Sequence, residues 1–161
     1  MAEHGTRVGW GFDAHRFGPG NRVVVCGVAV EHDRGVEATS DGDVAVHALI
    51  DALLGAVAVG DLGTYFNSDH PAMQGVSSME LLKRALRLVE EQRYRVGNVD
   101  VTIVSESVRV APHREAMRAS LASALGIDVA DVSVKATSTD GMGAIGTDEG
   151  IAATAAVMIY R

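Results

Sequence analysis

The sequence has few of the residues that characterise disulfide-rich, membrane-spanning or nucleic-acid-binding proteins. Its single cysteine, Cys26, cannot form an internal disulfide, which fits a reducing compartment. No apolar stretch is long enough to span a bilayer, and the polar start does not resemble a signal peptide. With 14 Lys and Arg against 21 Asp and Glu, the net charge of -7 disfavours a nucleic-acid backbone as partner. We therefore expect a cytoplasmic protein with no membrane and no nucleic acid among its partners.

Aromatic residues are also scarce, at 4% of the chain. Apolar residues nevertheless make up 47% and charged residues 22%, so the chain should fold around small aliphatic side chains that let elements approach closely. A length of 161 residues is that of one domain, and we expect residues 1–161 to form it. The negative charge still allows an anionic small molecule if metal cations and backbone N–H groups hold its phosphates.

Apolar periodicity divides the chain into strands and helices. Strands are expected at residues 7–12, 23–26, 28–31, 99–103, 132–136 and 151–159, and helices at residues 44–59, from residue 77 onward, and at 112–125. Ser77 and Glu80 have the spacing of a capping box at the start of the second helix. This mixture predicts an α+β (α/β-type sandwich) domain, in which helices pack on one face of a small mixed sheet.

The first candidate site is a metal centre. Asp13 and His15 follow the first expected strand, and residues two apart in extended backbone project to the same side, so both can bind one cation. His47, on the next helix, is the best candidate for a third ligand. Two imidazoles and one carboxylate with an open fourth position are typical of catalytic zinc. The alternative is that Asp13 caps a turn, His15 is exposed and His47 is a hydrogen-bonded core residue.

Asp51 lies four residues after His47, on the same face of the expected helix. That spacing suits a carboxylate outside the metal site that accepts a hydrogen bond from the second ring nitrogen of His47. An ordinary carboxylate on the helix surface explains Asp51 equally well.

Two loops next to helix boundaries carry further polar groups. Residues 40–43, Ser-Asp-Gly-Asp, offer hydroxyl and N–H groups for a polyol or a phosphate, although a plain helix N-cap explains them equally well. Asp61, just before Gly63, is either a ligand of sugar-alcohol hydroxyls or the end of a turn.

The third polar segment, residues 135–143, is a hydroxyl-rich strand end that runs into a glycine loop. Its Thr and Ser hydroxyls and free N–H groups suit phosphate oxygens, and Asp140 suits a hard cation such as Mg²⁺. The Gly-Lys-Thr order of a P-loop is absent. An ordinary Ser/Thr turn is the alternative.

Six segments together are more specific than any one alone. Residues 11–17, 40–48, 60–63, 97–103, 135–137 and 149–152 occur in the order seen in one family. From about Arg7 to its last residue, the chain resembles the 2-C-methyl-D-erythritol 2,4-cyclodiphosphate synthase family. The resemblance implies a homotrimer with active sites between neighbouring subunits. It also implies a phosphorus-oxygen lyase of the non-mevalonate isoprenoid pathway, which cyclises 4-diphosphocytidyl-2-C-methyl-D-erythritol 2-phosphate, a CDP-alditol phosphate, and releases CMP.

The resemblance also implies roles for individual residues. Asp13, His15 and His47 would hold Zn²⁺, and Asp140, where the family usually has Glu, would hold Mg²⁺ or Mn²⁺. Residues expected to contact the cytidine portion are Ser105, Arg109, Val110, Ala111, Ala136, Thr137 and Ser138. Residues expected to contact the alditol phosphate are Ser40, Asp61, Gly63, Phe66, Asn67, Ser68, Asp69 and His70.

The sequence departs from the family pattern at several positions. Thr39 and Ser138 are candidate catalytic residues. Thr39 stands where a His is common and can donate one hydrogen bond but cannot carry charge, whereas Ser138 stands where Thr is usual and keeps the hydroxyl. The loop at residues 66–70 has its carboxylates relocated, and Ala144 and Thr147 replace an aromatic residue and an Arg beside an axial cavity. We expect zinc binding to be retained. The alternatives are a relative that cyclises another CDP-activated polyol phosphate, and a non-catalytic trimer that binds cytidine nucleotides.

Overall fold

A mixed five-stranded sheet forms the framework of the protein. The computed structural model describes residues 5–67 and 70–161. The strands lie in the order β4-β1-β7-β5-β6, and only β5 and β6 run parallel to each other. A separate hairpin pairs β2 with β3. The bounds are β1 (Arg7–Gly18), β2 (Arg22–Val25), β3 (Val28–Glu31), β4 (Gly35–Val36), β5 (Arg95–Val104), β6 (Val132–Thr137) and β7 (Gly150–Tyr160).

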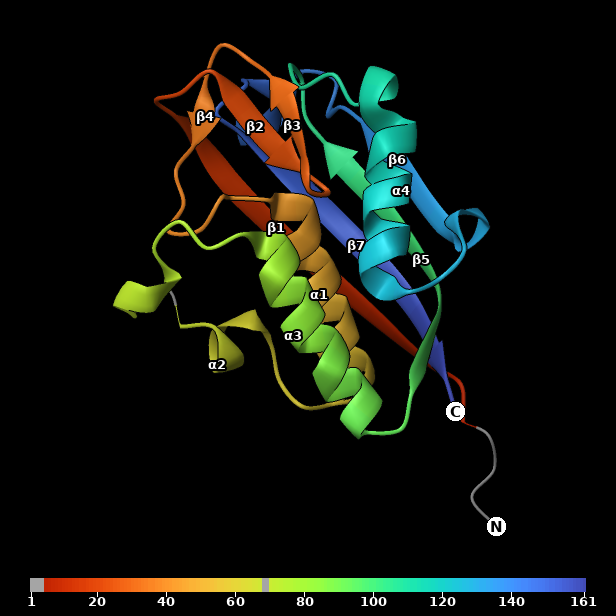
Figure 1. The fold of residues 1–161 in the computed structure, drawn as a ribbon. Coiled ribbons are helices and arrows are strands. Elements are labelled where there is room, and N and C mark those ends of the chain that lie inside the picture. The colour runs from red at the N-terminus through yellow and green to blue at the C-terminus, as the bar shows by residue number, and fades with distance from the viewer. Residues whose placement is uncertain (1–4, 68–69) are drawn as a thin grey trace.

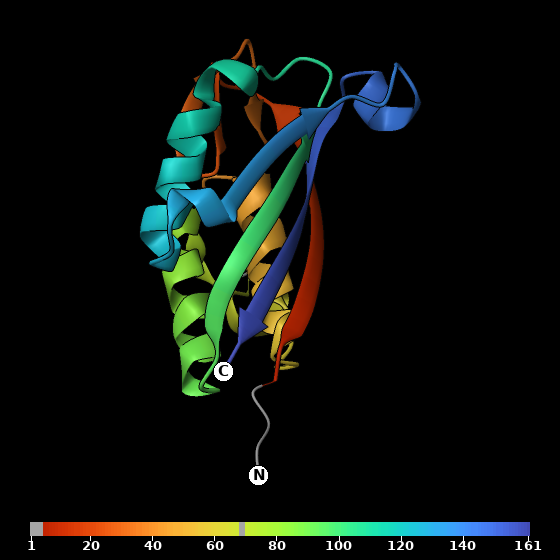
Figure 2. The ribbon, with the colours of Figure 1, turned by 90° about the vertical axis from the view of Figure 1, so that its right-hand side faces the viewer.

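Three long helices lie on one face of this sheet (Figures 1 and 2). They are α1 (Val44–Ala56), α3 (Ser78–Glu91) and α4 (Arg114–Leu125). Shorter turns are α2 (Leu62–Tyr65), α5 (Gly143–Gly146) and the 3₁₀ turns at Pro71–Met73, Ala111–His113 and Val129–Asp131. The fold class predicted from the sequence is therefore confirmed. Among the described residues, no helix is both long and apolar enough to cross a membrane.

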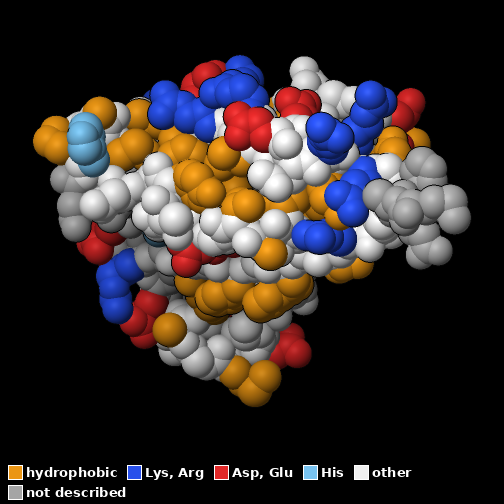
Figure 3. Space-filling view, turned by 90° about the horizontal axis from the view of Figure 1, so that it is seen from below, with side chains coloured by type: hydrophobic (Ala, Val, Ile, Leu, Met, Phe, Trp, Pro, Cys, Tyr) orange, Lys and Arg blue, Asp and Glu red, His pale blue; other side chains and the backbone are white. Residues whose placement is uncertain are grey.

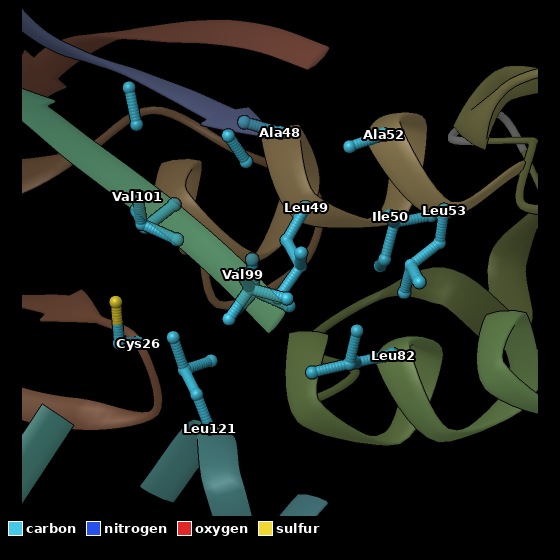
Figure 4. Close-up of a cluster of buried hydrophobic side chains, with 14 of the residues drawn as sticks. Cys26, Ala48, Leu49, Ile50, Ala52, Leu53, Leu82, Val99, Val101 and Leu121 are labelled. Carbon is cyan, nitrogen blue, oxygen red and sulfur yellow. The ribbon is translucent and has the colours of Figure 1, made fainter. Parts of the chain in front are cut away.

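Helix α1 is the centre of the core. It packs against β1, β7 and α3, and all of its residues are buried except Asp51 and Gly55. Figure 4 shows the side chains of Leu49 and Leu53 on this helix close to Val99 and Leu82, which belong to β5 and α3. A helix that is apolar on nearly every side must be buried on nearly every side.

Small residues set the distance between α1 and β1. A Cβ added to Gly9 would lie 1.8 Å from the carbonyl oxygen of Ala52, and one added to Gly11 would lie 2.0 Å from that of Ala48. Only glycine fits at either position. The close approach of elements expected from the small-residue composition is thus found where β1 meets α1.

The structure corrects several expected element boundaries. Strand β1 does not end before Asp13 but continues to Gly18, because Asp13 and His15 pair with residues of β7. Ser77 is the N-cap of α3, but its side chain makes no capping hydrogen bond. The third helix was expected to begin at Pro112, but residues 112 and 113 belong to the 3₁₀ turn Ala111–His113 and α4 begins at Arg114.

The other face of the sheet is covered by no helix of residues 5–67 and 70–161, and it exposes large apolar side chains. Val8, Trp10 and Phe12 alternate along β1 with the buried Gly9 and Gly11, so their side chains point away from α1. They are 72%, 64% and 51% exposed, respectively.

In the view from below, hydrophobic side chains reach the surface in patches, and basic and acidic side chains both occur among them (Figure 3).

Candidate metal centre and phosphate-binding loops

The side chains of Asp13, His15 and His47 converge at the junction of β1 and α1. The Asp13 Oδ2 atom lies 3.1 Å from His15 Nε2 and 3.0 Å from His47 Nδ1. The two ring nitrogens are 3.2 Å apart. Asp13 and His15 point toward α1 because they continue the alternation of Gly9 and Gly11 along β1.

One carboxylate oxygen and two imidazole nitrogens therefore lie within 4.8 Å of one another. This donor set suits zinc, because a site with three protein ligands leaves a fourth position for water or substrate. The alternative interpretation required an exposed His15 and an Asp13 that only caps a turn, but His15 is half-buried and faces the Asp13 carboxylate. His47 is buried and hydrogen-bonded, as that alternative also held, and its contacts include the same carboxylate. The residues thus fit a divalent metal ion.

The electrostatics of the cluster favour an ionised carboxylate. Burial by itself would raise the pKa of Asp13, but hydrogen bonds from His15 and His47 and their charge outweigh it and hold the pKa well below its usual range. An anionic oxygen is therefore present at neutral pH, which is the form that binds a cation.

The second ring nitrogen of His47 does not face Asp51, and this sequence prediction is wrong. His47 Nε2 lies 2.9 Å from Ser78 Oγ and 3.2 Å from Ser40 Oγ. Asp51 Oδ1 instead accepts a hydrogen bond of 2.7 Å from the backbone N–H of Leu62. The Asp51 carboxylate therefore holds the start of α2 in place and does not orient the imidazole of His47.

A cavity of about 280 Å³ opens beside the three candidate ligands. Thr39, Ser40 and Phe66 line it, so these predicted residues lie with the metal cluster. The full lining is Asp13, His15, Ala38, Thr39, Ser40, His47, Leu62, Phe66, Met73 and Leu81. Its wall is largely apolar near a charged centre, as in many ligand pockets.

The remaining residues predicted for the alditol phosphate lie on the segment after α1. Asp61 caps α2 by accepting hydrogen bonds from the N–H and hydroxyl of Thr64, and Gly63 lies within that turn. His70 caps the turn at Pro71–Met73 through its Nδ1 atom, and Asn67 is exposed. Ser68 and Asp69 lie outside the described residues.

A second group of predicted residues lies where β5 and β6 end at the same edge of the sheet. The N–H of Ser105 donates to the carbonyl of Thr137 at 3.0 Å, which joins the two following loops. Ala136, Thr137 and Ser138 are exposed. Asp140 has a left-handed backbone, and its Oδ1 accepts a bond of 3.4 Å from Ser138 Oγ. These residues do not line the cavity beside His47.

The next loop, residues 105–111, contains the other predicted cytidine contacts. Arg109 and Ala111 are exposed, whereas Val110 is only 2% exposed and its side chain belongs to the core. Val110 can therefore offer a ligand its backbone but not its side chain. Ser105 Oγ accepts a hydrogen bond of 3.1 Å from the N–H of Val108 and shapes the turn.

The sequence interpretation missed Glu106. Its Oε1 atom accepts hydrogen bonds from the N–H of Thr139 at 3.0 Å and of Gly141 at 3.4 Å, on either side of Asp140. Ser107 donates to Asp148 at 2.7 Å, at the far end of the same loop. Adjacent parallel strands end at one edge, so an acidic residue just after β5 was a signal for contact with the loop after β6.

Comparisons with known proteins agree with this geometry. Residues 6–160 match the family model described as the YgbB family. The chain belongs to the YgbB family. It is 51% identical to the 2-C-methyl-D-erythritol 2,4-cyclodiphosphate synthase of Thioalkalivibrio sulfidiphilus, over 95% of this chain and 96% of that one.

Two solved structures have the same fold as this chain. The bifunctional IspDF of Campylobacter jejuni superposes with a TM-score of 0.94 at 35% identity, over 98% of this chain and 43% of that one. A Plasmodium falciparum IspF in complex with CDP superposes with a TM-score of 0.84 at 27% identity, over 96% of each chain. The resemblance seen in the sequence is therefore confirmed.

Proposed function

We propose that this chain converts 4-diphosphocytidyl-2-C-methyl-D-erythritol 2-phosphate into 2-C-methyl-D-erythritol 2,4-cyclodiphosphate and CMP, as a phosphorus-oxygen lyase of the non-mevalonate isoprenoid pathway. The observation that carries the proposal is the convergence of Asp13, His15 and His47 in a chain that is 51% identical to a synthase of that name. A CDP-bound relative supports a cytidine nucleotide as part of the substrate.

The reaction requires positioning more than it requires a protein nucleophile. An oxygen of the substrate's 2-phosphate forms a bond to the β-phosphorus, the bond from that phosphorus to the bridging oxygen breaks, and CMP leaves with that oxygen. Zn²⁺ at Asp13, His15 and His47, and Mg²⁺ or Mn²⁺ at Asp140, would neutralise and polarise the crowded phosphates. Thr39 and Ser138 would each donate a hydroxyl hydrogen bond to a phosphate oxygen.

The binding residues divide the substrate between two places. In the proposal, the alditol phosphate lies in the cavity of Ser40 and Phe66, near Asp61 and Gly63, and contacts Asn67 and His70. The cytidine lies against the 105–111 loop and the exposed end of β6. Holding both ends of the substrate bends the substrate so that its 2-phosphate meets its β-phosphate.

These two places lie apart within one chain, and this favours the predicted homotrimer with sites between subunits. The α5 loop projects beyond the end of the sheet, away from α2 (Figures 1 and 2). The apolar side chains of Val8, Trp10 and Phe12 are exposed on the sheet face that lies opposite the helices, and an exposed apolar patch of this kind favours contact with another protein surface. We propose that this face packs in the trimer. The cytoplasmic location stays a prediction.

A turnover assay with a chelator tests the proposal. With the methylerythritol substrate, we expect CMP and the cyclic diphosphate in equal amounts, loss of both after chelation, and recovery on adding Zn²⁺ with Mg²⁺. Asp13→Asn should lower the rate at least about 100-fold, because a neutral amide replaces an anionic ligand. Asp33→Asn, the same change at an exposed carboxylate, is the matched control and should keep full activity.

The alternatives give different results in the same assay. Zinc binding without turnover of the methylerythritol substrate would indicate a relative that acts on another CDP-activated polyol phosphate. Thr39 and the 66–70 loop would then be the residues to exchange. CDP binding that is insensitive to chelator, without release of CMP from the substrate, would indicate the non-catalytic nucleotide-binding trimer and overturn the proposed function.

A further inference from the structure

The edge of the His47 ring that carries Nε2, on the side away from Asp13, contacts a buried hydroxyl group. Ser78, the first residue of α3, is fully buried, and its Oγ lies 2.9 Å from His47 Nε2. The same hydroxyl makes a short hydrogen bond to Asp41 Oδ1. A continuous line of polar groups therefore leads from the candidate metal ligand to a carboxylate in another loop.

The hydrogen-bonding capacity of each group determines which group donates and which accepts. A serine hydroxyl has one proton, and the Asp41 carboxylate can only accept it. Ser78 therefore donates to Asp41 and faces His47 with a lone pair. Among the described residues, the group that faces this lone pair is His47 Nε2, so a proton on Nε2 is donated to Ser78. In the neutral ring that binds a metal, Nδ1, the atom beside Asp13 and His15, then carries no proton. Without a metal, a second proton on Nδ1 can donate to Asp13, and the metal takes the place of that proton.

Asp41 is held rigidly enough to act in this way. Its Oδ2 accepts the N–H of Ser78 at 2.9 Å, so Asp41 caps α3, a task that the side chain of Ser77 does not perform. The N–H of Asp41 donates to the carbonyl of Val76 at 3.1 Å, which ties the loop before α1 to the loop before α3. The helix cap and the histidine contact thus use the same carboxylate.

Ser40 is a weaker alternative partner for the same ring nitrogen. Its Oγ lies 3.2 Å from His47 Nε2 and already accepts a bond from the N–H of Gly42 at 3.2 Å. The contact from Ser78 is shorter, and a carboxylate lies directly behind it.

We propose that Ser78 and Asp41 are positioning residues of the metal centre, which hold His47 in the tautomer and orientation that present Nδ1 to the metal. This inference rests on the proposed function, because it requires that the cluster of Asp13, His15 and His47 binds Zn²⁺. Carboxylates and hydroxyls outside the ligand shell commonly affect metal affinity in this manner.

Zinc affinity of the full-length chain is the direct test. The metal is removed and Zn²⁺ alone is titrated back in competition with a chromophoric chelator. Ser78→Ala should weaken zinc binding about 10- to 100-fold. Ser77→Ala is the matched control, because Ser77 is the exposed neighbour without a side-chain cap, and its affinity should equal that of the wild type.

Asp41→Asn keeps an acceptor for the serine hydroxyl but removes the charge, and it should weaken binding less than Ser78→Ala does. The two changes act on one chain of hydrogen bonds, so the double variant should lose no more affinity than Ser78→Ala alone. If Ser78→Ala does not fold, Asp41→Asn decides the question. In ¹⁵N NMR of the zinc-loaded wild type, the proton of the His47 ring should reside on Nε2.

The outcomes separate this inference from the proposed function. If the wild type binds no zinc, the proposed function fails. If the wild type binds zinc and both Ser78→Ala and Asp41→Asn bind it equally well, the positioning role is overturned while the metal centre stands. Fully additive losses in the double variant would also overturn it, because the two residues would then act independently.

Discussion

At the scale of single residues, Asp43 shows how a buried carboxyl group organises the surroundings of the metal cluster. Its Oδ1 accepts the N–H of Cys26 at 3.0 Å and of Val46 at 3.1 Å, and its Oδ2 accepts the N–H of Gly27 at 2.6 Å. It therefore caps α1 and fixes the β2–β3 turn at once. Burial raises the pKa of Asp43 to about 6, against the opposing effect of these three bonds.

This pKa predicts a specific pH dependence of stability. An unfolded Asp loses its proton near pH 4, whereas folded Asp43 keeps it to about pH 6. Between these values the folded state binds more protons than the unfolded state. The raised pKa of Asp43 therefore contributes its full stabilisation below pH 4, and this contribution is lost as the pH rises through 6. Relative to Asp43→Asn, the unfolding free energy of the wild type should fall by about 1.4 kcal/mol per pH unit in this window. Urea unfolding of both proteins with a chelator present measures the difference, and a pH-independent difference would contradict the prediction.

Spacing along the chain predicted one contact of the candidate site, because strand alternation puts Asp13 and His15 on the same face of β1. The choice of His47 as their partner rested on the family resemblance, and in the structure His47 faces them because α1 crosses β1 at glycines. The partner of the second His47 nitrogen was wrong because Asp51, although on the same helix, is captured by the N–H of Leu62. Ser78 lies 31 residues from His47, and no local pattern indicates that contact.

At the scale of elements, the packing of β1 on α1 positions the candidate ligands. Gly11 stands two residues before Asp13, and the carbonyl of Ala48 stands beside His47. Any change in the spacing between strand and helix would therefore separate His47 from its two partners.

Two glycine-to-alanine substitutions test this packing with the same chemical change. Gly11→Ala would place a Cβ 2.0 Å from the carbonyl of Ala48, and it should cost at least about 1–3 kcal/mol by overpacking and weaken zinc binding. Gly55→Ala, in α1 with nothing within 4 Å, should instead stabilise the protein by up to about 1 kcal/mol. Thermal or urea unfolding measures both. Equal stabilities for the two variants would show that the close approach does not constrain the fold.

Most elements were predictable from periodicity, and the errors lie at their ends. Residues 132–136 and 151–159 were expected as strands and are found in β6 and β7. The length of β1 could not be read from its own sequence, because its last residues are held by pairing with β7 and β4. The same is true of α3, whose cap comes from Asp41 rather than from a neighbouring residue.

At the scale of the whole molecule, the sheet has one covered face and one bare face. The bare face contains the exposed Val8, Trp10 and Phe12 and the ion pair of Lys135 with Asp100 at 2.7 Å. The second oxygen of Asp100 is buried and has no partner within the part of the chain that the structure describes. A neighbouring subunit that covers this face would bury the apolar side chains and offer that oxygen a donor.

The only tryptophan of the sequence lies on this face and reports whether it is covered. In a single chain Trp10 is 64% exposed, so its fluorescence would be that of an indole in water. In the proposed trimer its emission should shift to the blue and resist quenching by acrylamide, and sedimentation should give three times the chain mass of 16.8 kDa.

Phe12→Lys places a charge in the interface, and it should yield monomers with red-shifted emission and little turnover. Val129→Lys, at an exposed apolar residue outside this face, is the control and should stay trimeric. Water-like emission from the wild type at micromolar concentration would mean that the face is bare in solution, and a complete site would then have to form within one chain.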